Sequence, residues 1–191
     1  MNKLIGSIVV LGLALWLNGC GGTPPTKPAE KVSPPTPVAS AAAFPSELFL
    51  KEAPADAKEV SVVKKEAKEG DEVVVRGRIG GSENPFVDGR AVVTIADTSI
   101  RACNERPGDA CPNPWDFCCE DPNELVMRTA TIQVLDKDGK PLKQGLRGVN
   151  GIDHLTVLAV KGKVDKRGDP KVLTINASGI YIDKTPAKKT N

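Results

Sequence analysis

The chain has 191 residues, with 26 lysines and arginines against 24 aspartates and glutamates, so its formal net charge is only +2. A protein built mainly to bind phosphate backbones usually has a strong basic excess, and this balance argues against that class. Aromatic residues make up only 4% of the chain, which leaves few side chains for stacking on bases.

The first segment has the layout of a signal peptide. Lys3 supplies the positive charge, Leu4–Leu17 is an apolar run, and the small residue Gly19 precedes Cys20. The apolar run is shorter than the roughly 20 residues that a membrane-spanning helix needs. The alternatives are a plain secretory signal or an uncleaved anchor with an incidental cysteine.

The junction before Cys20 resembles a bacterial lipobox, although Asn18 replaces the small residue usual there. The resemblance implies that residues 1–19 are removed and that Cys20 becomes the N-terminus and carries the lipid. Gly21 follows in place of the aspartate that retains enterobacterial lipoproteins at the inner membrane. We therefore expect anchoring to the outer membrane, facing the periplasm, or at the cell surface, and the membrane is the first expected partner.

Residues 20–45 should form an extended tether, because this segment is rich in proline and cannot bury a core. Residues 184–191 form a short basic tail that we expect to be disordered. Between them, residues 46–183 should form one domain.

The domain shows period-two alternation with turn signals between the runs, which predicts an all-β fold. We expect single helical turns within 46–51 and 121–126, and a tight turn at 136–140 with Gly139 at positive φ. A strand-like lead-in begins at Val60 and Val62. The expected strands cover residues 72–79, 91–96, 129–135, 154–164, 172–175 and 179–182.

Two of these strands share the pattern apolar, basic, glycine, basic, apolar, at residues 75–79 and 160–164. Alternation places the glycine on the apolar face, where it lets a sheet coil sharply, and the basic residues on the other face. The basic residues could bind an anion such as nucleic acid, polysaccharide or lipid, but an ordinary solvated face is the preferred interpretation. They are Arg76, Arg78, Lys161 and Lys163.

The strands at residues 70–79, 157–164 and 175–182 resemble those of an OB-fold, a small five-stranded Greek-key barrel found in nucleic-acid and oligosaccharide binders. The chain also resembles a group of uncharacterised bacterial lipoproteins with this domain and the same Cys-Pro-x-Pro-Trp-Asp-x-Cys-Cys insertion, here Cys111–Cys119. Another small barrel or a β-sandwich is the alternative fold.

The loop between the second and third strands contains Cys103, Cys111, Cys118 and Cys119. Export favours two structural disulfides, in which Cys118 and Cys119 each pair with Cys103 or Cys111 in an undetermined order. A zinc site and a thiol-redox site are the two alternatives, and neither paired Cys-x2-Cys knuckles nor a redox Cys-x-x-Cys is present. We assign no metal ligand and expect no cofactor.

Trp115 and Phe117 in the same loop should pack over the cysteines, with an exposed recognition patch as the alternative. His154 is the single histidine, and we interpret it as a strand-edge residue. No convergent acid–base set is visible, so we expect no catalytic residue and no enzyme.

These observations predict a membrane-anchored cell-envelope lipoprotein whose barrel is a non-catalytic binding or assembly module for an envelope protein or glycan. A nucleic-acid-binding OB-fold protein is the first alternative, although nucleic acid is an unexpected partner for an exported chain. A zinc or thiol-redox protein using the four loop cysteines is the second.

Overall fold

The computed structural model describes residues 44–166 and 168–183. The predicted signal peptide, Cys20, nearly all of the tether and the basic tail lie outside the described residues. Among the helices that are described, none is both long and apolar enough to cross a membrane.

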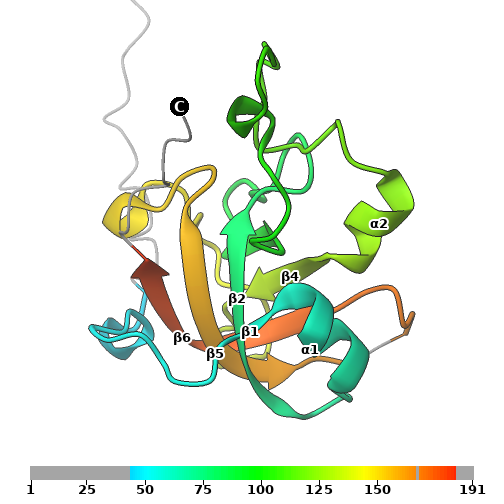
Figure 1. Cartoon of the computed structure of the whole chain (residues 1–191). Helices are drawn as coiled ribbons and strands as arrows, with labels where there is room; N and C mark the ends of the chain where they lie inside the picture. The colour runs from blue at the N-terminus through cyan, green and yellow to red at the C-terminus, as the bar shows by residue number, and fades with distance from the viewer. Residues whose placement is uncertain (1–43, 167, 184–191) are drawn as a thin grey trace, which may run out of the picture. The chain divides into compact units, whose positions relative to one another are not determined.

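The described part contains six strands, two short α-helices and three 3-10 turns (Figure 1). The strands are β1 (Lys58–Glu59), β2 (Glu72–Ile79), β3 (Val92–Ala96), β4 (Thr129–Gln133), β5 (Val157–Val164) and β6 (Thr174–Asp183). The helical elements are η1 (Ser46–Leu48), α1 (Val60–Glu66), η2 (Cys103–Glu105), α2 (Pro122–Met127) and η3 (Val149–Gly151).

Five of the strands close into a barrel. β2 pairs with β3, β3 with β4 and β6 with β5 in antiparallel fashion, whereas β4 and β6 run parallel. β5 then returns to β2 over seven paired positions, from Glu72–Lys163 to Arg78–Val157, which closes the sheet. The extra strand β1 lies parallel to β2. This arrangement confirms the predicted small OB-fold-like barrel.

The alternation predicted for β2 and β5 is present. Inward-facing Val75 and Val160 are fully buried in the barrel core. Gly77 and Gly162 also face inward, and a Cβ added there would lie 2.8 Å from Ile95 Cδ1 and 2.5 Å from Asn176 O respectively. Glycine at these two positions therefore allows the close approach between strands that a small barrel requires.

The strand-like lead-in predicted at Val60 is wrong, because this segment forms helix α1. Val60, Val63 and Ala67 are spaced at i, i+3 and i+7, which places them on one helical face. Val60 and Val63 are almost completely buried against the barrel, whereas Val62 is 37% exposed. A helical period places Val60 and Val63 on the buried face, as observed. A period of two would instead have buried Val62.

Other elements follow the expectations closely. Gly139 has φ of 72° in the turn after β4, and a helical turn forms at each of the two expected sites. The prediction of two strands at 172–175 and 179–182 is wrong, because one continuous strand, β6, runs from Thr174 to Asp183 and changes register with β5 between Lys161 and Gly162.

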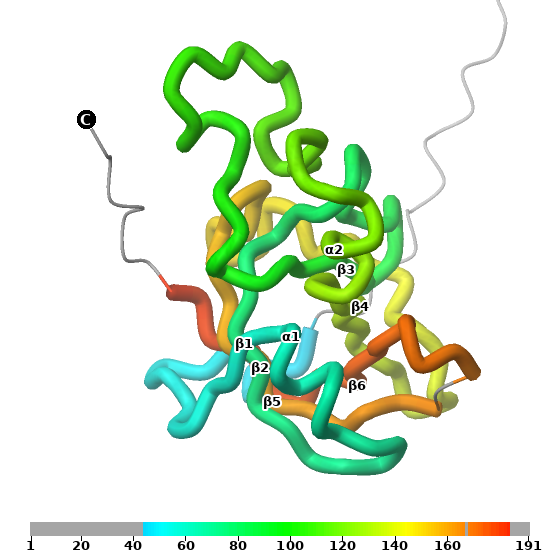
Figure 2. Tube along the Cα trace, turned by 45° about the vertical axis from the view of Figure 1, so that its right-hand side comes forward, coloured from blue at the N-terminus to red at the C-terminus, as the bar shows by residue number. Residues whose placement is uncertain are grey.

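The segment from Asp97 to Arg128, between β3 and β4, is an insertion that extends away from the strands (Figure 2, green). A small hydrophobic cluster, distinct from the barrel core, lies where the insertion leaves β3. Four buried residues form this cluster, with Leu125 and Leu155 packed against them: Ala96, Ile100, Ala102 and Phe117.

Candidate functional site

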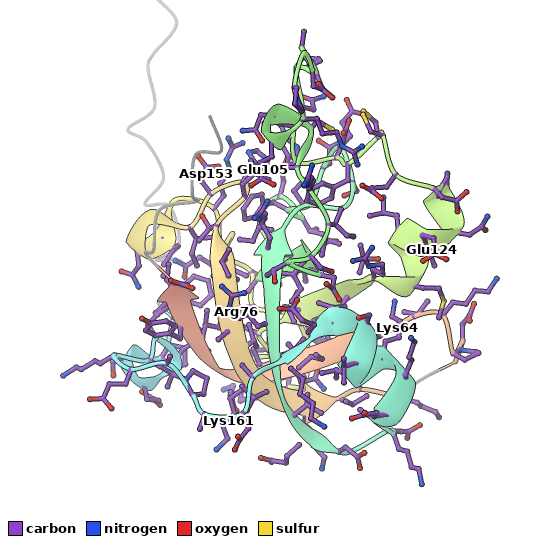
Figure 3. The ribbon with its side chains drawn as sticks, viewed as in Figure 1. Lys64, Arg76, Glu105, Glu124, Asp153 and Lys161 are labelled. Carbon is purple, nitrogen blue, oxygen red and sulfur yellow. The ribbon has the colours of Figure 1, made fainter. Side chains whose placement is uncertain are left out.

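The four basic residues predicted to share a face lie on the outer side of β2 and β5. Cross-strand pairing sets Val74 opposite Lys161 and Glu72 opposite Lys163, with the two arginines further along β2. Figure 3 shows Arg76 and Lys161 at different heights on this face. The four residues therefore lie on the face that the sequence predicted, but they form two separate groups and not one patch.

Carboxylates accompany the arginines. Arg76 lies 3.1 Å from Asp183 Oδ2 and 3.7 Å from Glu59 Oε1. Arg78 Nη1 lies 2.9 Å from Glu105 Oε1, and its side chain is only 13% exposed. These partners offset the positive charge of both arginines, so the arginine end of the face is not a cationic surface.

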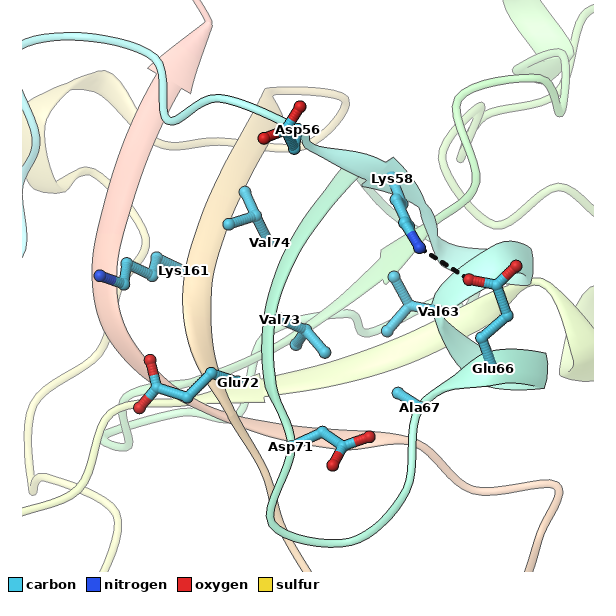
Figure 4. A pocket seen from close by; sticks show the side chains of 10 residues that line it. All are labelled: Asp56, Lys58, Val63, Glu66, Ala67, Asp71, Glu72, Val73, Val74 and Lys161. Atoms are coloured by element: carbon cyan, nitrogen blue, oxygen red, sulfur yellow. Dashed lines mark hydrogen bonds and ion pairs between the residues drawn. The ribbon is translucent and has the colours of Figure 1, made fainter.

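A groove opens beside the lysine end of this face, between α1, the start of β2 and the segment before β1 (Figure 4). Its volume is about 530 Å³. The apolar part of its lining comes from α1, its C-cap residue and β2: Val63, Ala67, Val73 and Val74. No pattern in the sequence predicts this groove directly, because its walls come from segments that only the folded barrel brings together.

The charged residues around the groove are predominantly acidic. Two of them are lysines, Lys58 and Lys161, and four are carboxylates: Asp56, Glu66, Asp71 and Glu72. Lys58 Nζ lies 2.7 Å from Glu66 Oε2, so this pair is internally neutralised. Acidic charge therefore remains in excess around an apolar floor.

The two predicted disulfides are not formed in the structure, where the four loop cysteines are free thiols. The Sγ atoms of Cys111 and Cys118 lie 3.6 Å apart, and those of Cys103 and Cys118 lie 3.8 Å apart. A disulfide needs about 2.05 Å between the sulfurs. The sequence correctly grouped these residues, but their sulfurs stand at contact distance and not at bonding distance.

The surroundings of Cys118 do not suit a redox thiol. Hydrogen bonding with the Cys111 and Cys103 thiols and with the Asp116 carboxylate raises the pKa of Cys118 well above its usual range. A reactive thiol needs a lowered pKa, because the thiolate is the nucleophile.

Asp116 joins the cysteines, and sequence reasoning missed it. Its Oδ1 lies 3.8 Å from Cys103 Sγ and 3.9 Å from Cys111 Sγ, and it accepts a 2.9 Å hydrogen bond from the Cys118 amide. The one feature of the sequence that could have indicated its role is its position two residues before Cys118.

Trp115 and Phe117 attach the insertion to the barrel. Phe117 is 1% exposed, which confirms that it packs inside. Trp115 is half-buried and stacks on His154, with ring centroids 3.8 Å apart, while its Nε1 donates to Glu83 O over 2.9 Å. The amide of Gly81 donates to Trp115 O over 2.8 Å.

His154 is enclosed by aromatic rings. Phe86 contacts it edge to face, with ring centroids 5.3 Å apart, whereas Trp115 stacks parallel to it. Burial and the nearby Arg147 charge lower the pKa of His154, and Asp153 only partly opposes them. The ring is thus mainly neutral at pH 7 and serves packing between the insertion and the barrel.

Asp97 links the base of the insertion to α1, and its role was not predicted. It is 1% exposed and accepts hydrogen bonds of 3.1 Å from the amides of Ser61 and Ser99, with Arg128 3.6 Å away. Burial raises the pKa of Asp97, but the hydrogen bonds from Ser61 and Ser99 outweigh burial and lower the pKa from 3.8 to about 2. It therefore stays ionised at neutral pH.

In comparisons with known proteins, no family model and no curated protein matches this chain. The fold and the geometry of the candidate sites thus carry the functional argument.

Proposed function

We propose that this chain is a lipid-anchored cell-envelope protein whose OB-fold-like barrel is a non-catalytic binding module. In this proposal, the groove between α1 and β2 receives a polypeptide segment of an envelope partner. The groove itself is the observation that supports the proposal: about 530 Å³ of space with an apolar floor and charged residues around it.

The chemistry of the groove favours a polypeptide with apolar and basic side chains. Val74 and Val73 offer an apolar surface, and burying such surface contributes about 25 cal/mol per Å². Glu72 and Asp71 add negative charge beside it. Electrostatic complementarity of this kind selects partners and speeds their association.

The outer face of β3 and β4 offers little to a nucleic acid. OB-folds bind oligonucleotides on the corresponding face, and single-strand binders add aromatic platforms and basic residues to it. Here the outward positions of the two described strands have neither: Val92, Thr94, Thr129, Thr131 and Gln133. This composition favours the binding-module hypothesis over the nucleic-acid alternative.

Anchoring follows from the N-terminal residues and is part of the same proposal. Lipid at Cys20 would place the barrel near a membrane surface, and the proline-rich segment 20–45 would hold it at a distance. Acyl chains give stable anchorage because each buried methylene contributes about 0.8 kcal/mol.

Photo-crosslinking in intact cells tests the groove. We expect a photoreactive amino acid at position 74 to give a discrete adduct with an envelope protein. The same amino acid at position 172 is the control, because Val172 is 52% exposed and outside the groove. Absence of an adduct at 74, or an identical adduct at both positions, would contradict the proposal.

A further inference from the structure

Three thiols and one carboxylate of the insertion converge on a common point. Cys103, Cys111, Cys118 and Asp116 each direct one possible ligand atom into the group, and all four atoms lie within 4.8 Å of one another. Among the separations within this group are 3.6 and 3.8 Å between sulfurs, and 3.8 and 3.9 Å from sulfur to Asp116 Oδ1.

These separations lie within a few tenths of an ångström of the edges of a tetrahedron around one metal ion. Zinc binds thiolate sulfur at about 2.3 Å and carboxylate oxygen at about 2.0–2.2 Å, which gives edges of roughly 3.5–3.8 Å. A single cystine bond does not account for the three-sulfur group, since Cys118 Sγ lies 3.6 and 3.8 Å from two sulfurs and can bond to only one of them. From this geometry we propose that Cys103, Cys111, Cys118 and Asp116 bind one Zn²⁺ ion.

The backbone holds these ligands in place independently of any ion. Cys103 is fully buried, and its amide donates to Pro114 O over 3.1 Å. The Cys111 amide donates to Asp109 Oδ1 over 2.7 Å. Phe117 has φ of 56°, and this left-handed turn buries its ring between Asp116 and Cys118 while both of those residues remain in the cluster.

The site has the character of a structural metal centre. Four protein ligands would fill the tetrahedron and leave no open position for catalysis. Binding would replace three S–H bonds with Zn–S bonds and release three protons to solvent, while the carboxylate enters already ionised and no redox change occurs. Metal-binding free energy then stabilises the insertion, which contributes only three side chains to the small buried cluster at its base.

Cys119 provides a matched control on the neighbouring residue. It is exposed, its Sγ lies 3.4 Å from Asp109 Oδ2, and it is not one of the four converging donors, although its sulfur lies within 4.8 Å of that of Cys103. A second possible group, Cys103 with Asp109 and Cys119, offers only three donors and shares Cys103, so it is the weaker site.

The experiment measures zinc bound to the full-length chain, purified in detergent with reductant, loaded with Zn²⁺ and passed through a desalting column. We expect about one zinc per chain, and thiolate-to-cobalt charge-transfer absorption when Co²⁺ replaces it. Cys118→Ser and Asp116→Asn should weaken zinc binding, Cys118→Ser by more than about 100-fold, since even outer-sphere changes commonly cost 10- to 100-fold. Cys119→Ser should retain one zinc.

Three results would overturn the proposal. One is a reduced chain that retains no zinc and gives no cobalt–thiolate absorption. Another is equal loss of zinc in Cys119→Ser and Cys118→Ser. The third is peptide mapping of Cys111–Cys118 and Cys103–Cys119 disulfides in a chain that binds no zinc after reduction. Each outcome concerns the insertion alone and leaves the groove proposal unaffected.

Discussion

Asp97 is the residue at which the insertion, α1 and the barrel meet. Its carboxylate accepts hydrogen bonds from the amides of Ser61 and Ser99, and it lies near Arg128 at the far end of the insertion. A buried charge is stable only when such partners replace water. One carboxylate thus fixes both ends of a long loop.

Replacing Asp97 with asparagine should destabilise the domain by about 2 kcal/mol at pH 7, because the lowered pKa reports that amount of charge stabilisation. A carboxyl with a pKa near 2 in the folded state and 3.8 in its ordinary state stabilises the fold fully above about pH 5. That contribution falls as the pH drops from about 4 towards 2. The difference between wild type and Asp97→Asn should therefore shrink over this range.

Urea unfolding of both proteins at several pH values provides the measurement. The free energy of unfolding should differ clearly at pH 7 and much less near pH 2. A difference that stays constant across the range would show that the Asp97 charge contributes nothing and that only the shape of its side chain matters.

At the scale of elements, the loop between β2 and β3 is the surface on which the insertion rests. A Cβ added at Gly80 would lie 2.4 Å from Trp115 O and 2.9 Å from Phe117 Cε2. These separations are too short for any side chain. The close approach of Trp115 to the backbone of Gly80 therefore explains the glycine at this position better than a turn preference does.

Gly80→Ala should loosen the insertion and leave the barrel folded, at a cost of about 1–3 kcal/mol typical of overpacking. Displacement of Trp115 would break its contact with the Gly81 amide and its stacking on His154. We expect faster amide exchange across residues 97–128 with no change in β5. Gly145→Ala is the control, because the nearest atom to its added Cβ is 3.9 Å away. Equal rates of amide exchange across residues 97–128 in the two variants would show that the Gly80 contact does not hold the insertion in place.

At the scale of the whole molecule, the sequence predicted the barrel well because its signals were local. Alternation marked the inner and outer faces of β2 and β5, and Gly77 and Gly162 marked close strand approach. Helix α1 was missed because Val60 and Val62 fit a period of two as well as Val60 and Val63 fit a helical period. A seven-residue element offers too few positions to separate the two periods.

The candidate sites were less predictable because they depend on contacts between distant segments. Glu72 and Lys161 border one groove only because β5 pairs with β2. Arg76 and Arg78 lie on the expected face, but the carboxylates that offset them come from other elements. The cysteines were grouped correctly, whereas their bonding state depends on sulfur positions that sequence spacing does not define.

Anchoring by Cys20 is testable on the intact protein. Cys20→Ser should abolish incorporation of labelled palmitate and move the chain out of the membrane fraction, because no acyl chain would be attached. Cys119→Ser is a matched control that should leave both properties unchanged. Membrane retention without label in the Cys20→Ser variant would favour an uncleaved anchor.

The central claim, that the groove binds a basic polypeptide segment, is tested most directly by reversing one charge beside the photo-crosslinker at position 74. Glu72→Lys should reduce the yield of the adduct at least several-fold, because it replaces acidic charge with basic charge beside the ligand. Glu124→Lys, the same change on exposed helix α2 (Figure 3), should leave the yield unchanged. An adduct that forms equally well with Lys at position 72 would contradict the account.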